Sequence, residues 1–187
     1  RKALENLGGK NVLGKLFDFG KVEENKFSDH TIDELIKACY AMGKVKTGAL
    51  IVIEDEILLN EYVRTGIDID AIISSQLLIN IFEKNTPLHD GAVIVRGDRV
   101  VSATCYLPLS DSMTLSKDLG TRHRAAVGIS EVSDSLTIVV SEETGKVSIA
   151  MRGQIYRNVN ADFLRGKLGL LKRRFMNGKK DSKNLGE

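Results

Sequence analysis

Three short apolar runs constrain the fold of this chain more than any other feature of its sequence. They cover residues 49–53, 92–95 and 136–140, and they are rich in β-branched side chains. Short apolar runs without a regular polar–apolar alternation are typical of strands that are buried on both faces. We therefore expect a central sheet that other elements cover.

Helix patterns alternate with these strands. Thr31 and Glu34 form a capping-box pattern ahead of an apolar stripe. Either serine of the pair at 74–75 can cap a second helix, and Thr121 can cap a third. A last helix is expected over about residues 161–171, where leucines recur at helical spacing.

Hairpins are predicted for the remaining strands. A turn joins each of the three runs to a following segment, so we expect pairing partners at residues 57–63, 100–106 and 147–151. Strands that alternate with helices, and are also joined by hairpins, favour a mixed central β-sheet flanked by α-helices. The predicted fold class is therefore α/β.

The length of the chain suits one domain with two tails. Its 187 residues, 42% of them hydrophobic, are enough to form a core. Glycines interrupt residues 1–28, which we expect to form an N-terminal arm. The domain is expected over residues 29–172, and the charged segment 173–187 is predicted to be a disordered tail.

Charge and cysteine content exclude several classes of protein. The net charge of +2 argues against a protein that coats nucleic acid. Cys39 and Cys105 are too few for a disulfide framework, and they form no metal-binding pair. No apolar run approaches the roughly 20 residues of a membrane span. Because the first residue is Arg1 rather than Met, we expect a fragment, which would not contain an upstream membrane anchor.

The first candidate site is the segment from His89 to Ala92. Asp90 stands at the start of a buried strand, and Gly91 lets a ligand approach the backbone closely. A carboxylate beside a bare backbone suits a divalent metal that is held together with a phosphate. The alternative is that Asp-Gly is simply a turn that leads into the strand.

The second candidate site is the start of the helix that Thr121 caps. Arg122, His123 and Arg124 crowd its first turn, although a helix N-terminus already carries positive partial charge. A bound anion relieves this repulsion, so the segment is predicted to clamp a polyphosphate. The alternative is a basic turn in contact with solvent.

Two further segments follow strands. Ser141 could meet a phosphate, and Glu142 or Glu143 could meet a metal, although such a segment is also typical of a hairpin turn. Tyr106 could stack on a base, or it could belong to the core or its rim. We find neither a Walker loop nor a Gly-x-Gly-x-x-Gly motif.

The two candidate sites together resemble the "DGA" and "RHR" signatures of diadenylate cyclase domains. Asp90-Gly91-Ala92 and Arg122-His123-Arg124 stand in the expected order and contexts, and the resemblance runs from about Asp29 to Leu171. It also includes Thr47-Gly48-Ala49. The chain looks most similar to the membrane-anchored cyclases, which implies a cytoplasmic catalytic domain in a protein anchored to the bacterial membrane.

The resemblance implies an enzyme that condenses two ATP molecules into the second messenger cyclic di-AMP and releases two pyrophosphates. It implies catalytic roles for Asp90, Arg122, His123 and Arg124, with Asp90 on a divalent metal (Mg²⁺, Mn²⁺ or Co²⁺). His89 and Glu143 would be additional metal ligands. The substrate would lie on Gly91, Ala92, Tyr106, Leu107, Thr121, Ser141 and Glu142.

Symmetry implies a homodimer. The product has two equivalent 3′–5′ linkages, so two domains that each hold one ATP should face each other around a two-fold axis. Regulatory protein partners fit this interpretation, and direct nucleic-acid binding does not. Two rival functions remain: a sensor that binds ATP or the dinucleotide without turnover, and an interaction module whose Arg-His-Arg turn docks an acidic partner.

Overall fold

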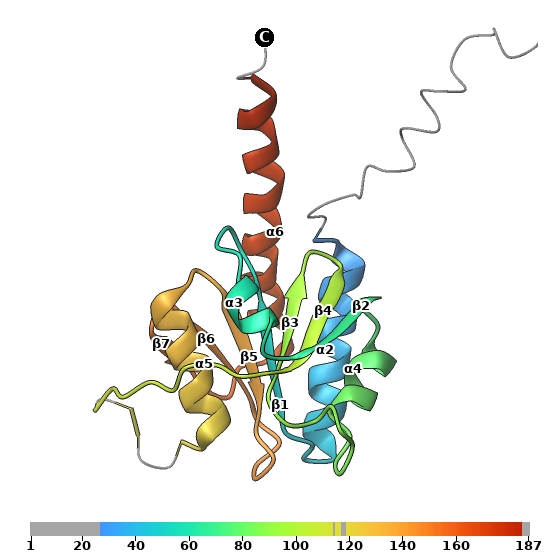
Figure 1. Ribbon diagram of the computed structural model, residues 1–187, viewed down its shortest axis with the longest axis vertical. Coiled ribbons are helices and arrows are strands. Elements are labelled where there is room, and N and C mark those ends of the chain that lie inside the picture. The colour runs from blue at the N-terminus through green and yellow to red at the C-terminus, as the bar shows by residue number, and fades with distance from the viewer. Residues whose placement is uncertain (1–26, 114, 117–118, 185–187) are drawn as a thin grey trace, which may run out of the picture.

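Seven strands form one mixed sheet at the centre of the fold (Figure 1). The computed structural model describes residues 27–113, 115–116 and 119–184, with side chains up to residue 172. The strand order is β2-β4-β3-β1-β5-β6-β7. The bounds are β1 (Ala49–Ile53), β2 (Ile67–Ile72), β3 (Ala92–Arg96), β4 (Arg99–Cys105), β5 (Leu136–Val140), β6 (Val147–Met151) and β7 (Gln154–Tyr156). β1 pairs with β3 in parallel, and the other neighbouring strands pair antiparallel.

Helices cover both faces of this sheet, which confirms the predicted α/β class (Figure 1). Helices α2 (Asp29–Lys44), α4 (Ser75–Ile81) and α6 (Ala161–Asn184) pack on one face, and α5 (Thr121–Val132) with the short α3 (Asn60–Val63) packs on the other. Successive side chains of a strand point to opposite faces. In β1, Ile51 therefore joins the α2 side while Leu50 joins the α5 side, and this is why the run is apolar throughout.

The predicted partner of β1 is wrong. Residues 57–63 form no strand: part of this segment is α3, and β2 follows it and pairs with β4. Both sides of β1 are already occupied, by β3 and by β5, so no hairpin partner can add there. The sequence does not predict the edge strands β2 and β7. β2 is largely exposed, and β7 has only three residues, so neither has the apolar run of a buried strand.

The last helix is longer than the sequence predicts. α6 ends at Asn184, so the backbone is helical over most of the segment for which we expected a disordered tail. Lysine and arginine recur in this segment, and both are good helix formers. The predicted arm falls largely outside the described residues, and the division into arm, domain and tail stays a prediction.

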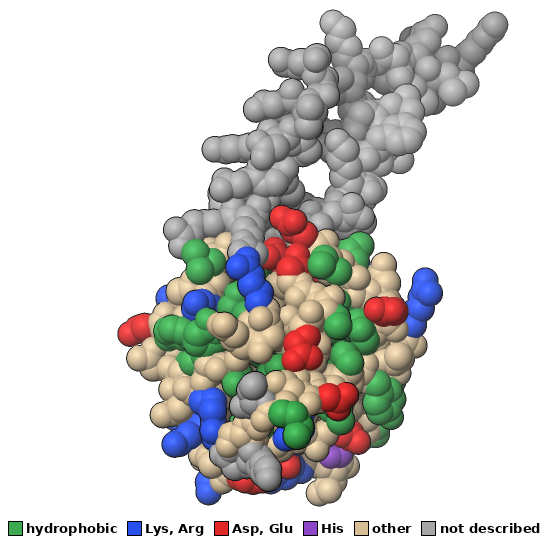
Figure 2. Space-filling model, turned by 90° about the vertical axis from the view of Figure 1, so that its left-hand side faces the viewer, with side chains coloured by type: hydrophobic (Ala, Val, Ile, Leu, Met, Phe, Trp, Pro, Cys, Tyr) green, Lys and Arg blue, Asp and Glu red, His purple; other side chains and the backbone are tan. Residues whose placement is uncertain are grey.

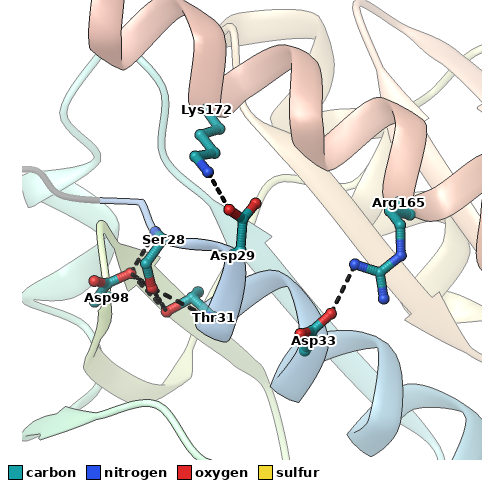
Figure 3. Close-up of polar contacts among 7 residues, drawn as sticks. All are labelled: Ser28, Asp29, Thr31, Asp33, Asp98, Arg165 and Lys172. Carbon is teal, nitrogen blue, oxygen red and sulfur yellow. Dashed lines mark hydrogen bonds and ion pairs between the residues drawn. The ribbon is translucent and has the colours of Figure 1, made fainter.

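The start of α2 is tied to two other parts of the fold. Ser28, rather than the predicted Thr31, caps the helix: its Oγ accepts a hydrogen bond from the N–H of Thr31 at 3.2 Å (Figure 3). Asp98 in the β3–β4 turn accepts hydrogen bonds from Ser28 Oγ at 2.9 Å and from Thr31 Oγ1 at 2.6 Å. The Thr31 hydroxyl is therefore engaged with Asp98 instead of acting as the cap.

Ion pairs join the same helix to α6. Lys172 Nζ lies 2.5 Å from Asp29 Oδ2, and Arg165 Nη1 lies 2.7 Å from Asp33 Oδ1 (Figure 3). Together with the hydrogen bonds to Asp98, which follows the C-terminal end of β3, these contacts fix the start of α2 at that end of the strand. Asp90, by contrast, precedes the N-terminal end of that strand.

A buried carboxylate at the end of β1 yields a stability prediction. Glu54 is 1% exposed, and its oxygens accept hydrogen bonds from Arg96 and from the N–H of Leu59. The pKa of Arg96 is raised, chiefly by its hydrogen bond to Glu54. Because Arg96 is partly exposed, we expect Arg96→Ala to lower the free energy of unfolding by about 2 kcal/mol, below the usual range for breaking a buried pair.

Urea denaturation tests this prediction against a matched variant. Arg99 pairs with Asp70, whose side chain is 81% exposed, so Arg99→Ala should lower the free energy of unfolding by less than about 1 kcal/mol. Equal losses in the two variants would contradict a special role for the buried carboxylate.

Glu34 on α2 makes the stability depend on pH. Its carboxylate accepts a hydrogen bond from the backbone N–H of Ser75 at 2.5 Å. This bond is the main reason why the pKa of Glu34 lies below the ordinary glutamate value of 4.5. A lowered pKa in the folded state contributes stability that is present above pH 4.5 and is lost as the pH falls through the folded-state pKa.

We therefore expect unfolding free energies measured from about pH 6 to about pH 3 to fall more steeply for the wild type than for Glu34→Gln. The uncharged amide does not titrate, so the variant lacks this contribution to the slope. Parallel curves for the two proteins would contradict the prediction.

Candidate active site

One cavity of about 590 Å³ opens at the edge of the sheet where β1 and β3 begin and where β4 and β5 end. The start of α5 forms one wall. This volume lies within the range of small-molecule sites. The cavity brings together most of the residues that the sequence singled out: Asp90, Gly91, Tyr106, Leu107, Thr121, Arg122, His123, Ser141, Glu142 and Glu143.

Three predicted site residues do not line the cavity. Ala92 is completely buried in β3. Nδ1 of His89 lies 2.6 Å from the carbonyl oxygen of Thr86. Nη1 of Arg124 lies 3.5 Å from the carbonyl oxygen of Ser110. The side chain of Arg124 thus lies toward the loop after β4, whereas Arg122 lines the cavity.

Several lining residues were missed by the sequence reasoning, and they are mostly apolar. They are Leu50, Cys105, Leu109, Gly120, Ala125, Val139 and Val140. Most sit at strand ends or on the buried side of α5. The sequence offered one indication of these residues, namely their position beside the predicted polar segments. It could not show that β1 and β5 lie next to each other, because this follows from the strand order.

The backbone at Gly91 brings Asp90 close to β4. Gly91 has a φ of +97°, and a Cβ on it would lie 2.8 Å from the carbonyl carbon of Thr104. The pairing of β3 with β4 shifts register between Ala92 and Ile94. Glycine is required here both by the positive φ and by the close approach of the two backbones. The Asp-Gly segment is thus a bend that leads into β3 and also places an exposed carboxylate at the cavity.

The start of α5 carries the basic wall of the cavity. Gly120 is the N-cap and makes no side-chain capping bond, so the predicted cap at Thr121 is wrong and Thr121 is the first helical residue. Arg122 reaches across to the β5–β6 turn, where its Nη1 lies 2.9 Å from Oε2 of Glu142. Positive side chains thus lie where the helix dipole also favours an anion.

The β5–β6 turn is held in place by its own hydrogen bonds and by α2. The Oγ of Ser141 accepts from the N–H of Glu143 at 3.3 Å and of Thr144 at 3.2 Å. Gly145 has a φ of +72° and packs tightly on Gly43 of α2: a Cβ on Gly145 would lie 2.1 Å from the carbonyl oxygen of Gly43. The segment is therefore the hairpin turn of the alternative interpretation, and it also faces the cavity.

The loop after β4 forms the opposite wall. The N–H of Tyr106 donates to Oγ1 of Thr65 at 2.9 Å, and the N–H of Ser110 donates to the carbonyl oxygen of Arg124 at 3.0 Å. At Gly128 a Cβ would lie 2.1 Å from the carbonyl oxygen of Pro108. The first contact ties the loop to the segment after α3, and the other two tie it to α5. The Tyr106 side chain is 73% exposed.

The described residues contain no group of three or more His, Cys, Asp and Glu side chains arranged to hold a metal ion. Asp90 nevertheless offers an exposed carboxylate to the cavity, and Glu143 lines the same cavity. Mg²⁺ is commonly held by one or two carboxylates together with the phosphates of a substrate. These residues therefore fit a metal that binds together with a nucleotide.

Figure 2 shows the molecule turned so that the left-hand side of Figure 1 faces the viewer. Basic, acidic and hydrophobic side chains are interspersed on this face, without the single-sign surface of a nucleic-acid-coating protein. In the part of the chain that the structure describes, no helix is long and apolar enough to span a membrane.

Residues 36–155 match the family profile described as "DAC: DisA bacterial checkpoint controller nucleotide-binding". This chain belongs to the DAC family. It is 50% identical over 165 residues to cyclic di-AMP synthase CdaA of Bacillus subtilis (strain 168) and 52% identical over 164 residues to a diadenylate cyclase of Listeria monocytogenes serotype 1/2a (strain 10403S). Each match covers 88% of this chain and 59% of the relative, so the chain spans little more than half the length of these relatives.

Solved structures agree with the assignment. The crystal structure of a double mutant of DacA from Staphylococcus aureus has a TM-score of 0.74 and 49% identity, covering 76% of this chain and 95% of that chain. A hypothetical membrane spanning protein from Bacillus cereus has a TM-score of 0.67 and 44% identity, covering 68% of this chain and 63% of that chain. The α/β fold is therefore that of the DAC family.

Proposed function

We propose that this domain is the catalytic domain of a diadenylate cyclase, which condenses two ATP molecules into cyclic di-AMP and releases two pyrophosphates. One observation carries the proposal: the Asp90 carboxylate and the basic start of α5 line the same cavity. A polyphosphate that bears a metal needs both kinds of group within reach of one another. The names of the Bacillus and Listeria relatives support the same activity.

The chemistry follows from the product. In each half-reaction a 3′-oxygen forms a bond to the α-phosphorus of the other ATP, the bond from that phosphorus to the β-phosphate bridging oxygen breaks, and the hydroxyl proton leaves. One cavity holds one ATP, so we propose a homodimer in which two cavities face each other. Positioning and charge neutralisation then account for most of the rate acceleration.

Each cavity residue takes a role from its place. Thr121, Arg122 and His123 would bind the triphosphate at the start of α5, Ser141 and Glu142 would contact the phosphate and ribose region, and Tyr106 with Leu107 would contact the adenine. Gly91 would let the nucleotide lie against the backbone. Arg124 holds the loop at Ser110, so we assign it the role of supporting that wall instead of binding phosphate.

Asp90, with Glu143 as the second candidate, would hold a divalent metal. Such an ion, Mg²⁺, Mn²⁺ or Co²⁺, lowers the pKa of the attacking hydroxyl and offsets phosphate charge. His89 is left out of this set because it does not line the cavity and its ring faces the Thr86 carbonyl.

The wider setting follows from the relatives. We propose that residues 29–172 form a cytoplasmic domain, and that the full-length protein is anchored to the bacterial membrane, as the Bacillus cereus neighbour suggests. Regulatory protein partners are part of this proposal. Nucleic acid is not, because the net charge of +2 and the few aromatic side chains argue against nucleic-acid binding.

Chromatography of ATP incubated with the protein and Mg²⁺ or Mn²⁺ tests the activity. We expect a cyclic di-AMP peak and a specific activity that rises with protein concentration, because the active unit is a dimer. A thermal shift with ATP and metal, but no product at any concentration, would favour the sensor. No thermal shift at all would favour the interaction module.

A further inference from the structure

Gly48, directly before β1, lies against the guanidinium of Arg122. A Cβ on Gly48 would lie 2.9 Å from Nη1 and 3.0 Å from Cζ of Arg122, and 3.1 Å from Cβ of Glu142. Real Cβ atoms essentially never approach other heavy atoms to less than 3.0 Å. The guanidinium therefore occupies space that is open because residue 48 has no side chain.

The usual reasons for a glycine are absent at this position. Gly48 is not among the described residues with positive φ, so its backbone conformation is open to other residues. The three atoms nearest to its Cβ position all belong to side chains, whereas at Gly128 the nearest atom is the backbone carbonyl oxygen of Pro108. A methyl group at position 48 would thus first meet the flexible end of Arg122, which can move away, and the Cβ of Glu142.

Glu142 holds the same guanidinium from another side. Its Oε2 lies 2.9 Å from Nη1 of Arg122, and the side chain of Arg122 is 25% exposed. Arg122 therefore bridges three separate segments of the chain: the start of α5, the start of β1 and the β5–β6 turn. A long, flexible side chain is fixed in this way before any ligand arrives.

We propose that Gly48 is a positioning residue, which together with Glu142 forms a seat that directs the Arg122 guanidinium toward the triphosphate. The inference rests on the proposed function for the identity of that ligand. Catalytic and binding groups act best when packing and neighbouring contacts lock their orientation in advance. Gly48 itself touches no substrate in this scheme and acts through Arg122.

The seat can be tested without any ligand. In the free protein, the Nε–Hε NMR signal of Arg122 is identified by its loss in Arg122→Ala. We expect a high order parameter for this Nε–Hε bond in the wild type and a value below about 0.6 in Gly48→Ala. Gly166→Ala is the matched control, because a Cβ there meets nothing within 4 Å, and it should leave the signal unchanged. An unchanged Arg122 signal in Gly48→Ala would overturn the inference.

A double-mutant cycle tests the consequence for binding. The probe is 3′-deoxy-ATP with Mg²⁺, which lacks the attacking hydroxyl and cannot be cyclised. Calorimetry should show about tenfold weaker binding to Gly48→Ala, and at least that loss for Arg122→Ala. Adding Gly48→Ala to Arg122→Ala should then weaken binding no further, because Gly48→Ala acts through the Arg122 side chain, which the double variant already lacks. Additive losses would overturn the inference.

The two proposals fail separately. A wild-type protein that binds the probe in the pattern above but yields no cyclic di-AMP from ATP would refute the cyclase and leave the seat supported. A protein that makes cyclic di-AMP equally well with Gly48 or Ala at this position would refute the seat and leave the cyclase supported. If the wild type does not bind the probe, the NMR comparison still decides whether Gly48 orders Arg122.

Discussion

Asp90→Asn is expected to reduce cyclic di-AMP formation at least about 100-fold. The amide keeps the size of the carboxylate but carries no negative charge, so it binds a divalent cation poorly, and the attacking hydroxyl loses its activation. Because Asp90 is exposed at the cavity, its replacement should leave the fold intact. Product formation by chromatography and the urea midpoint measure these two effects separately.

Asp68→Asn is the matched control for this variant. Asp68 is an exposed aspartate on the edge strand β2, and it does not line the cavity. We expect wild-type activity and stability for Asp68→Asn. An Asp90→Asn protein that still makes cyclic di-AMP at the wild-type rate would remove Asp90 from the mechanism, and an unfolded one would show that the residue supports the structure instead.

Gly91→Ala is expected to have the largest effect on stability. The substitution places a Cβ within 3.0 Å of three backbone atoms of β4, at a φ of +97° that side chains rarely adopt. A strained backbone costs about 1–3 kcal/mol, and overpacking a buried contact costs a similar amount. We therefore expect urea denaturation to show a free energy of unfolding lower by about 2–6 kcal/mol.

Gly166→Ala should change stability in the opposite direction. Gly166 lies in α6, where a Cβ has open space, and alanine is the better helix former. An increase of about 0.4–1 kcal/mol is expected. A Gly91→Ala protein as stable as the wild type would contradict the close approach of the backbone at Gly91 to β4.

The strands of the sheet interior could be predicted because their signal is local. A strand buried on both faces must be apolar along its whole length, and residues 49–53, 92–95 and 136–140 are so except for Thr137. The edge strand β2 carries exposed aspartates and shares no such pattern. A hairpin partner of β1 is expected instead at residues 57–63, because proximity in sequence favours a hairpin unless the neighbouring positions are already filled.

The candidate site divides in the same way. Asp90 and Arg122 could be named from the sequence because each is a polar interruption in apolar surroundings, and because the two motifs occur together. The sequence could not show that Arg122 lines the cavity while Arg124 contacts the loop after β4, since this depends on how α5 packs. Gly48 belongs to a segment that takes part in the family resemblance, but the sequence attaches no role to it, because the role proposed for it depends on its contact with Arg122 of α5.

The sequence by itself determined the α/β class, the family and the two motifs, since apolar runs and short motifs are properties of neighbouring residues. The tertiary structure alone decided which residues meet. Strand order placed β5 beside β1, and this brought Glu142 to Arg122 and Arg122 onto Gly48. These contacts join residues 20 to 94 positions apart in the chain. They arise from packing around the sheet, and no local pattern records them.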